Sequence, residues 1–451
     1  MAEVTRRNFI VTALGAAATA KAAAAQTRVP KGSRPNILFI LADDMGWADL
    51  SCYGRPDYKT SNLDRLATQG VRFTNAYSAA PVCTPTRIGF ITGRYPARLR
   101  VGLEEPLFER KELTEDQLRS YGIPSEHPTV ASIIKSAGYS TALIGKWHAG
   151  YLPYFGPLKS GFDEFYGNMS GAVDHFTHKD MTDSLDFYEG EVPVERVGYM
   201  TELLTDRAIE YVKRPHKKPF YLSLHYTSPH WPWEGPQDIA TSNAMKYDAT
   251  GFRAGGSLKV YGEMMKSLDA GIGRVLEALR STGLERNTLV IFTSDNGGER
   301  FSYNWPFTGQ KLDVHEGGVR VPAIVRWPAV TRAATVTDQP AITMDWTATM
   351  VTAAGGRPAP EYPMDGVDLT TFLASKRPRF DRTFYWRTRR QGAVRSGNWK
   401  YIREGKTESL HDLSRDEHEQ ANFADAEPQR LAGMGKQFDN WESQMVRYPQ
   451  T

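Results

Sequence analysis

The stretch NILFILA, Asn36–Ala42, is followed directly by Asp43 and Asp44. This almost entirely apolar run is too short for a buried helix and does not alternate with polar residues. Such runs are typical of strands that are buried on both faces of a parallel sheet. The stretch therefore predicts a central strand that carries two carboxylates at its C-terminal end.

Three further stretches repeat this arrangement of a strand followed by a polar cluster. Strands are predicted at 139–144, 219–226 and 287–294, and helices at 61–69, 83–92, 128–137 and 256–281. The clusters after the strands contain Lys146 and His148, then His230, then Asp295 and Asn296. Open α/β sheets bind ligands at the carboxyl ends of their strands, so we expect these clusters to form one site.

The chain changes character after residue 357. Short aromatic-rich segments at 384–386, 392–395 and 399–402 predict a small antiparallel sheet, and 428–446 predicts a closing helix. The expected fold class is α/β, with a large mixed, mostly parallel sheet flanked by helices and a small C-terminal antiparallel sheet with a helix. The expected domains are a catalytic domain at 36–357 and a C-terminal subdomain at 358–451.

Composition narrows the range of functions. Hydrophobic residues make up 40% of the chain and charged residues 24%, as in ordinary globular proteins. The formal net charge is only +3 and no basic block dominates, so nucleic acid is not an expected partner. Cys52 and Cys83 are the only two cysteines, so we expect no disulfide framework; a bridge between them is the alternative.

The first 26 residues are typical of a signal peptide. An Arg6-Arg7 pair precedes a short, alanine-rich apolar run, as in twin-arginine signals. A membrane anchor is the alternative, although the run is short for a span. We expect a periplasmic or secreted protein, exported by the twin-arginine route, with no membrane span after signal removal.

Asp43, Asp44, Asp295 and Asn296 offer hard oxygen ligands from two strand ends. This composition suits Ca²⁺ or Mg²⁺, whereas zinc prefers His or Cys. Adjacent carboxylates repel each other unless a cation lies between them. The four residues predict a site for one divalent cation, and a solvated turn is the alternative for the aspartate pair.

Cys83-Thr84-Pro85-Thr86-Arg87 has the pattern C-x-P-x-R. Pro85 suits the first turn of a helix, which would place unpaired N–H groups beside Cys83 and Arg87 one turn further on the same face. A buried structural cysteine and a thiolate nucleophile are alternatives that the pattern alone leaves open.

The C-x-P-x-R pattern together with the aspartate pair, Gly145-Lys146-Trp147-His148, Asp295-Asn296 and Gly309-Gln310-Lys311 resembles the type I sulfatases. These are the formylglycine-dependent, arylsulfatase A-like members of the alkaline phosphatase-like superfamily, and the resemblance runs from Asn36 to the C-terminus. It implies that a formylglycine-generating enzyme converts Cys83 to formylglycine. It also implies one divalent ion, usually calcium with magnesium as the alternative, at Asp43, Asp44, Cys83, Asp295 and Asn296.

The resemblance also implies roles for the remaining site residues. Arg87 would stabilise the formylglycine, and Lys146 and Lys311 would contact sulfate oxygens. His148 would take a proton from the spare hydroxyl of the formylglycine hydrate. His230 would protonate the leaving alcohol, with His225 as the alternative.

Several polar residues lie outside the shared pattern. Asp174, His175 and His178 cluster in one segment, and Arg387, Arg389 and Arg390 in another. We expect Asp174, His175, His178 and Arg387 to contact a sugar or its carboxylates, and solvated surface positions are the alternative.

The expected function is a sulfuric ester hydrolase that removes sulfate from a sulfated carbohydrate by S–O cleavage, with aryl sulfates also accepted. Two alternatives stay open. One is a phosphonate monoester or phosphodiester hydrolase of the same superfamily. The other is a non-catalytic binder of sulfated glycans, which would follow if Cys83 were not modified.

Overall fold

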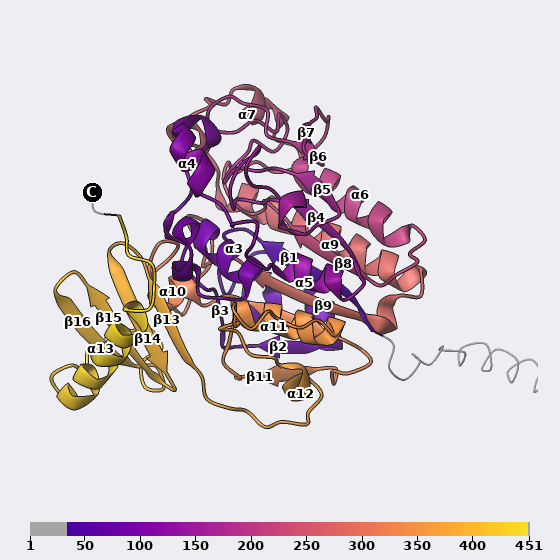
Figure 1. Cartoon of the computed structure of the whole chain (residues 1–451). Coiled ribbons are helices and arrows are strands. Elements are labelled where there is room, and N and C mark those ends of the chain that lie inside the picture. Colours follow the sequence, from indigo (N-terminus) through magenta and orange to yellow (C-terminus); the bar gives the residue numbers. More distant parts are fainter. Residues whose placement is uncertain (1–33, 450–451) are drawn as a thin grey trace, which may run out of the picture. The chain divides into compact units, whose positions relative to one another are not determined.

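The structure is a computed structural model and describes residues 34–449 (Figure 1). The predicted signal peptide at 1–26 lies outside the described residues. None of the helices in the described part of the chain is both long enough and apolar enough to cross a membrane.

A ten-stranded mixed sheet forms the centre of the fold. β1 (Asn36–Ala42) lies between β8 (Phe220–His225) and β9 (Thr288–Ser294) and is parallel to both. β4 (Ser140–Gly145) is parallel to β8, and β5 (Glu164–Gly167) is parallel to β4. The predicted strands are therefore confirmed as the parallel centre of the sheet.

Shorter strands extend the sheet on both sides in the order β11-β2-β10-β9-β1-β8-β4-β5-β6-β7. β10 is antiparallel to β9 and β2, and β6 is antiparallel to β5 and β7, which makes the sheet mixed. The outer strands are β2 (Val71–Phe73), β10 (Ala323–Arg326), β11 (Thr335–Thr337), β6 (Tyr188–Glu189) and β7 (Val192–Pro193); β3 (Ala76–Tyr77) and β12 (Ala341–Ile342) form a separate pair.

Helices cover both faces of this sheet. Leu38 and Ile40 of β1 belong to one core cluster with residues of α2 (Ser61–Gln69), α6 (Met200–Lys213) and α9 (Leu258–Ser281). Ile37 and Phe39 belong to the opposite cluster with α3 (Cys83–Thr92), α5 (Val130–Ser136) and α11 (Thr343–Ala354). Successive side chains of a strand point to opposite faces, so this division confirms the predicted burial of β1 on both sides. In Figure 1, α6 and α9 run side by side.

Capping residues set the observed helix boundaries. α5 begins at Val130 because the Thr129 hydroxyl accepts a hydrogen bond from the Ser132 N–H at 3.0 Å. α9 begins at Leu258, where Ser257 accepts from Val260 N–H. The remaining short helices are α4 (Glu115–Ser120), α7 (Ile239–Asn243), α8 (Ala249–Arg253), α10 (Glu316–Val319) and α12 (Thr370–Leu373).

The C-terminal region is a four-stranded antiparallel sheet with one helix. β13 (Thr383–Arg387), β14 (Gln391–Ser396), β15 (Trp399–Glu404) and β16 (Thr407–Asp412) pair in chain order, and α13 spans Pro428–Glu442. β16 is missing from the sequence prediction because its six residues, TESLHD, contain a single large apolar side chain. The domain division at residue 358 stays a prediction.

Candidate active site

Four strand ends converge at one edge of the central sheet. Asp43 and Asp44 follow β1, and the neighbours of β1 end in register with it, with Ala42 opposite Ser294 and Leu41 opposite His225. β4 ends beside β8, with Gly145 opposite His225. The residues that follow these strands are all buried: Asp43, Asp44, Lys146, His148, His230, Asp295 and Asn296. The predicted convergence of the polar clusters is present in the structure.

The carboxylates and the amide form a compact group. Asp44 N–H donates to Asp295 Oδ1 at 3.1 Å, and Asn296 Nδ2 donates to Asp44 Oδ1 at 2.7 Å. Burial raises the pKa of Asp295 to about 6, and the nearby Asp43 carboxylate adds to this. Burial also raises the pKa of Asp44, to which Asp295 contributes. The site therefore holds negative charges that disfavour one another.

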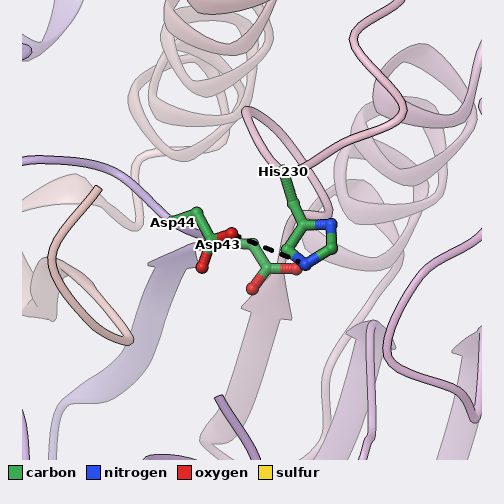
Figure 2. Close-up of side chains that lie close together, drawn as sticks. All are labelled: Asp43, Asp44 and His230. Carbon is green, nitrogen blue, oxygen red and sulfur yellow. Dashed lines mark ion pairs between the residues drawn. The ribbon is translucent and has the colours of Figure 1, made fainter. Parts of the chain in front are cut away.

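This group fits a divalent cation. The buried Oδ1 atom of Asn296 has no hydrogen-bond partner among the described residues, and the Oδ1 atom of Asp43 has no hydrogen bond there but lies 3.3 Å from Arg87 Nη2. Asp43, Asp44 and His230 bring ligand atoms within 4.8 Å of one another, and Figure 2 shows the three side chains facing a common point. Oxygen atoms dominate the donor set, which suits Ca²⁺ or Mg²⁺.

Three cations surround the carboxylates. Arg87 Nη2 lies 3.0 Å from Asp295 Oδ2 and 3.3 Å from Asp43 Oδ1. Lys146 Nζ lies 2.6 Å from Asp43 Oδ2, and Lys311 Nζ lies 2.6 Å from Asp44 Oδ2. Three carboxylates thus face three cations, so a bound divalent ion would leave the site with a positive excess.

Cys83 is the first residue of α3, and its side chain is buried. Gly93 ends the helix in a left-handed conformation, with φ of 69°, where the sequence predicts the end. Burial raises the pKa of the Cys83 thiol, although Lys146 and Lys311 oppose the shift. A reactive thiolate needs a lowered pKa, and burial acts in the opposite direction here.

The two predicted catalytic histidines differ in their partners. His148 Nε2 is 3.0 Å from the Leu107 carbonyl oxygen, and burial together with Lys146 keeps the pKa of His148 well below its ordinary value. His230 Nε2 lies 3.1 Å from Lys311 Nζ, and burial followed by Lys311 lowers the pKa of His230 in the same way. Both imidazoles are therefore neutral at neutral pH.

His225, the alternative to His230, contacts a side chain of its own strand, the backbone of Lys146 and the side chain of Arg87. Its ring nitrogens lie 2.8 Å from Ser223 Oγ and 3.1 Å from the Lys146 carbonyl oxygen, and Arg87 Nη1 is 3.4 Å away. These contacts place the His225 ring next to the guanidinium group of Arg87, where it helps to position that group.

Among the described residues, the predicted sugar-binding residues make contacts that do not involve the carboxylates of Asp43, Asp44 and Asp295. Asp174, His175 and His178 are buried, and Asp174 Oδ1 accepts from the N–H groups of Phe176 and Thr177. Arg387 donates to the Val446 carbonyl oxygen at 2.6 Å. Within residues 34–449, none of the four predicted residues forms an ion pair with Asp43, Asp44 or Asp295. Their role in substrate binding stays a prediction.

Glu299 is a site residue that the sequence analysis does not identify. Its carboxylate lies 3.8 Å from Lys311 Nζ and accepts a hydrogen bond from Trp231 Nε1 at 2.9 Å. No sequence pattern singles out a glutamate four residues after Asp295, because its distance from Lys311 depends on how the loop after β9 folds.

Comparison with known proteins identifies the family. The family model described as Sulfatase matches residues 35–356, which include every residue of this site. The chain belongs to the sulfatase family. The predicted resemblance and fold class are confirmed, and the protein is a sulfuric ester hydrolase.

Individual relatives support this assignment. The N-acetylgalactosamine-6-sulfatase of Mus musculus is 33% identical over 387 residues, which cover 81% of this sulfatase and 71% of that protein. The steryl-sulfatase of Homo sapiens is 30% identical over 434 residues, which cover 78% and 72% of the two chains. The structure of Ps i-CgsB in complex with k-i-k-neocarrahexaose has a TM-score of 0.81 at 27% identity, over 92% of this chain and 94% of that chain.

Proposed function

We propose that this sulfatase removes sulfate from a sulfated saccharide by S–O cleavage, with Cys83 converted to formylglycine and with one bound divalent cation. The observation that carries the proposal is the convergence of Arg87, Lys146 and Lys311 with three carboxylates around the first residue of α3. An aldehyde hydrate formed from Cys83 would supply the nucleophilic hydroxyl. A formylglycine-generating enzyme is therefore a necessary partner.

Asp43, Asp44, Asp295 and Asn296 would hold the cation, which we propose to be Ca²⁺, with Mg²⁺ as the alternative. When bound, the ion would supply Lewis acidity toward a sulfate oxygen. Arg87 then balances the charges of Asp43 and Asp295, to which it lies at 3.3 and 3.0 Å. The positive excess at the site favours an anionic substrate over a neutral one.

Lys146 and Lys311 would bind the sulfate group. Both ammonium groups are held in place by carboxylates, so they need little reorganisation when negative charge grows on the leaving oxygen. Fixed cations of this kind stabilise a transition state more than a ground state. Burial alone would lower the pKa of Lys311, but Asp44 and its neighbours raise that pKa above its ordinary value, and Lys311 stays charged.

His230 would protonate the leaving alcohol. Its imidazole would first take a proton from solvent when the negative sulfate group binds beside it, because a nearby opposite charge favours the protonated ring. An ammonium group has only donors, so in the protein without substrate Lys311 donates to His230 Nε2 and His230 Nδ1 donates to the Trp231 carbonyl oxygen at 2.6 Å. Neutral His148, with Nδ1 free of a hydrogen-bond partner among the described residues, would accept a proton from the formylglycine hydrate.

A saccharide is the substrate class that the relatives favour. The first curated relatives are named for N-acetylgalactosamine 6-sulfate, and Ps i-CgsB was solved with a neocarrahexaose. Residues 1–26 support export by the twin-arginine route to the periplasm or beyond, where such polysaccharides are found.

The test is sulfate release by protein that is co-produced with a formylglycine-generating enzyme. The substrates would be N-acetylgalactosamine 6-sulfate, a sulfated carrageenan oligosaccharide, 4-nitrocatechol sulfate and bis-4-nitrophenyl phosphate. We expect sulfate release from at least one saccharide. Faster hydrolysis of the phosphodiester than of every sulfate ester would overturn the proposal.

A further inference from the structure

A cleft of about 580 Å³ opens beside Lys311. Three segments and one further residue line it: the loop at 103–108, the segment at 310–313, the turn at 388–391 between β13 and β14, and Glu404 of β15. Its volume lies within the range of about 300–1,000 Å³ that is usual for ligand sites. Because Lys311 also contacts Asp44 and His230, the cleft borders the active site at Lys311.

Two walls of the cleft are joined to residues next to Cys83. Leu107 N–H donates to Thr84 Oγ1 at 3.1 Å, and the Leu107 carbonyl oxygen contacts His148. On the opposite side, Leu312 N–H donates to the Pro81 carbonyl oxygen at 2.7 Å. A ligand in the cleft would therefore be held at a fixed position relative to the nucleophile.

The third wall is a short, hydrogen-bonded turn from the C-terminal sheet. Thr388 N–H donates to the Gln391 carbonyl oxygen at 2.7 Å, and Gln391 N–H donates to Thr388 Oγ1 at 2.9 Å. Arg389 N–H donates to Glu105 Oε2 at 3.1 Å, and Gln391 Oε1 accepts from Val314 N–H at 3.1 Å. The turn is thus hydrogen-bonded to Glu105 of one wall and to Val314, which follows the other. Arg389 and Arg390 are exposed at its tip.

Most acidic side chains of the cleft have a partner, whereas its two arginines form no ion pair within residues 34–449. Glu104 pairs with Arg100, Glu105 accepts from the Tyr448 hydroxyl, and Asp313 pairs with His315 at 2.6 Å. Neither guanidinium at the tip of the turn forms an ion pair with any residue in the 34–449 range, although that of Arg389 lies 5.0 Å from the centre of the Tyr448 ring. The fourth acidic residue that lines the cleft is Glu404, and its side chain is exposed. Unpaired cations beside a sulfate site favour a ligand with more than one anionic group.

The cleft also exposes apolar surface. Phe108 is 59% exposed and Leu312 is 53% exposed, and both line the cleft. Exposed apolar side chains that are rimmed by polar groups mark ligand grooves. An exposed aromatic ring together with two adjacent arginines suits a charged sugar chain.

We infer that Arg389 and Arg390 bind a second anionic group, a uronate carboxylate or a further sulfate, on the sugar next to the one that loses its sulfate. This inference rests on the proposed function and narrows its substrate class to polyanionic oligosaccharides. It moves the sugar-reading role from Arg387, which donates to the backbone of Val446, to the next two arginines of the turn.

Binding and turnover are measured separately to test it. Binding is measured by calorimetry in the inactive Cys83→Ala background, with a chondroitin 6-sulfate tetrasaccharide, its carboxyl-reduced form, and a neocarrahexaose that carries sulfates alone. The test variants are Arg389→Ala/Arg390→Ala and Glu404→Gln. The matched control is Lys406→Ala, which removes an exposed cation from the same sheet outside the cleft.

We expect the double arginine variant to bind the charged oligosaccharides at least about tenfold more weakly, and Glu404→Gln to bind them more tightly. Loss confined to the uronate-bearing probe identifies a carboxylate, and an equal loss on the neocarrahexaose identifies a sulfate. Unchanged affinity in the double variant, an equal loss in Lys406→Ala, or no binding of any probe by the Cys83→Ala protein would overturn the inference.

Turnover of 4-nitrocatechol sulfate by the modified wild-type protein distinguishes the two proposals. The double arginine variant should keep this activity within about twofold, since an aryl sulfate has no second anion to bind. If wild-type protein with formylglycine at position 83 hydrolyses no sulfate ester, the proposed function fails. If the double variant loses aryl and saccharide activity equally, only the subsite fails.

Discussion

Buried carboxylates in close contact have shifted pKa values in this sulfatase. Asp44 and Asp295 both have raised pKa values, for which burial is the main cause and neighbouring carboxylates a further one. A cation that binds only the folded protein stabilises it by mass action. The affinity of the site for metal should therefore be visible in the stability of the protein as well as in its activity.

We expect calcium to raise the melting temperature of the protein and chelation to lower it. At a hundredfold excess over the dissociation constant, the gain is about 2.7 kcal/mol, which corresponds to several degrees. Differential scanning calorimetry with Ca²⁺, Mg²⁺, EGTA and EDTA measures this shift and ranks the two ions. Asp295→Asn is the control and should lose the response. Equal melting temperatures in Ca²⁺ and EDTA would contradict the assigned metal site.

Lys311 is expected to act on the chemical step. Its ammonium group lies 2.6 Å from Asp44 and 3.1 Å from His230, so Lys311→Ala removes a sulfate contact and the hydrogen-bond donor to His230 together. Loss of one fixed electrostatic contact typically lowers kcat by about 10²–10³-fold. Steady-state sulfate release measures the effect, with Lys406→Ala as the surface control. A loss of less than about fivefold would show that Lys311 has no such role.

At the level of elements, the strand ends position the site because backbone crowding leaves them little freedom. Gly145 ends β4 with φ of 113°, and a Cβ there would lie 1.7 Å from the His225 carbonyl oxygen. The next residue, Lys146, donates its N–H to the same oxygen at 3.0 Å. Glycine at this position therefore allows β4 and β8 to end side by side.

Gly145→Ala should destabilise the protein by about 2–4 kcal/mol, because it adds both overpacking and an unfavourable φ. Gly433 in α13 is the matched control, since a Cβ there meets nothing within 4 Å. Gly433→Ala should stabilise by up to about 1 kcal/mol, as expected for an open helical position. Urea denaturation measures both variants, and similar midpoints for the two would refute the crowding argument.

Elements with strong local signals are the ones that the sequence predicts correctly. The boundaries of β1, α2 and α3 agree with the prediction because an apolar run, a terminating Gly70 and a terminating Gly93 mark them. β16 escapes prediction because its pairing with β15 depends on backbone contacts more than on apolar side chains. The position of Glu299 and the cleft at the β13–β14 turn depend on distant segments that meet only in the folded chain.

At the scale of the whole molecule, a buried ion network connects the C-terminal sheet to the loop that carries Lys311. Lys400 of β15 is fully buried and lies 2.8 Å from Glu316 and 2.9 Å from Glu419. Glu316 begins α10, five residues after Lys311. The C-terminal sheet therefore supports the active site from outside the sequence region that the family model matches.

Lys400→Met should destabilise the protein by about 3–5 kcal/mol, because buried Glu419 loses its ion-pair partner and buried Glu316 is left with Arg320, at 3.2 Å. Arg403→Ala is the control on the same strand, with partly exposed ion pairs to Glu408 and Asp439. Its cost should not exceed about 1 kcal/mol. Partial recovery in Lys400→Met/Glu316→Gln/Glu419→Gln would confirm that unpaired charge is the cause. Equal denaturation midpoints for Lys400→Met and Arg403→Ala would show that the network contributes little.

The most direct test of the account combines peptide mass with sulfate release in one preparation. Wild-type protein made with a formylglycine-generating enzyme is digested to determine the mass at position 83, and the same sample is assayed beside Cys83→Ala. We expect an aldehyde in place of the Cys83 thiol, sulfate release in proportion to the modified fraction, and no release by the variant. Undiminished release by Cys83→Ala, or by protein that keeps an unmodified thiol, would contradict it.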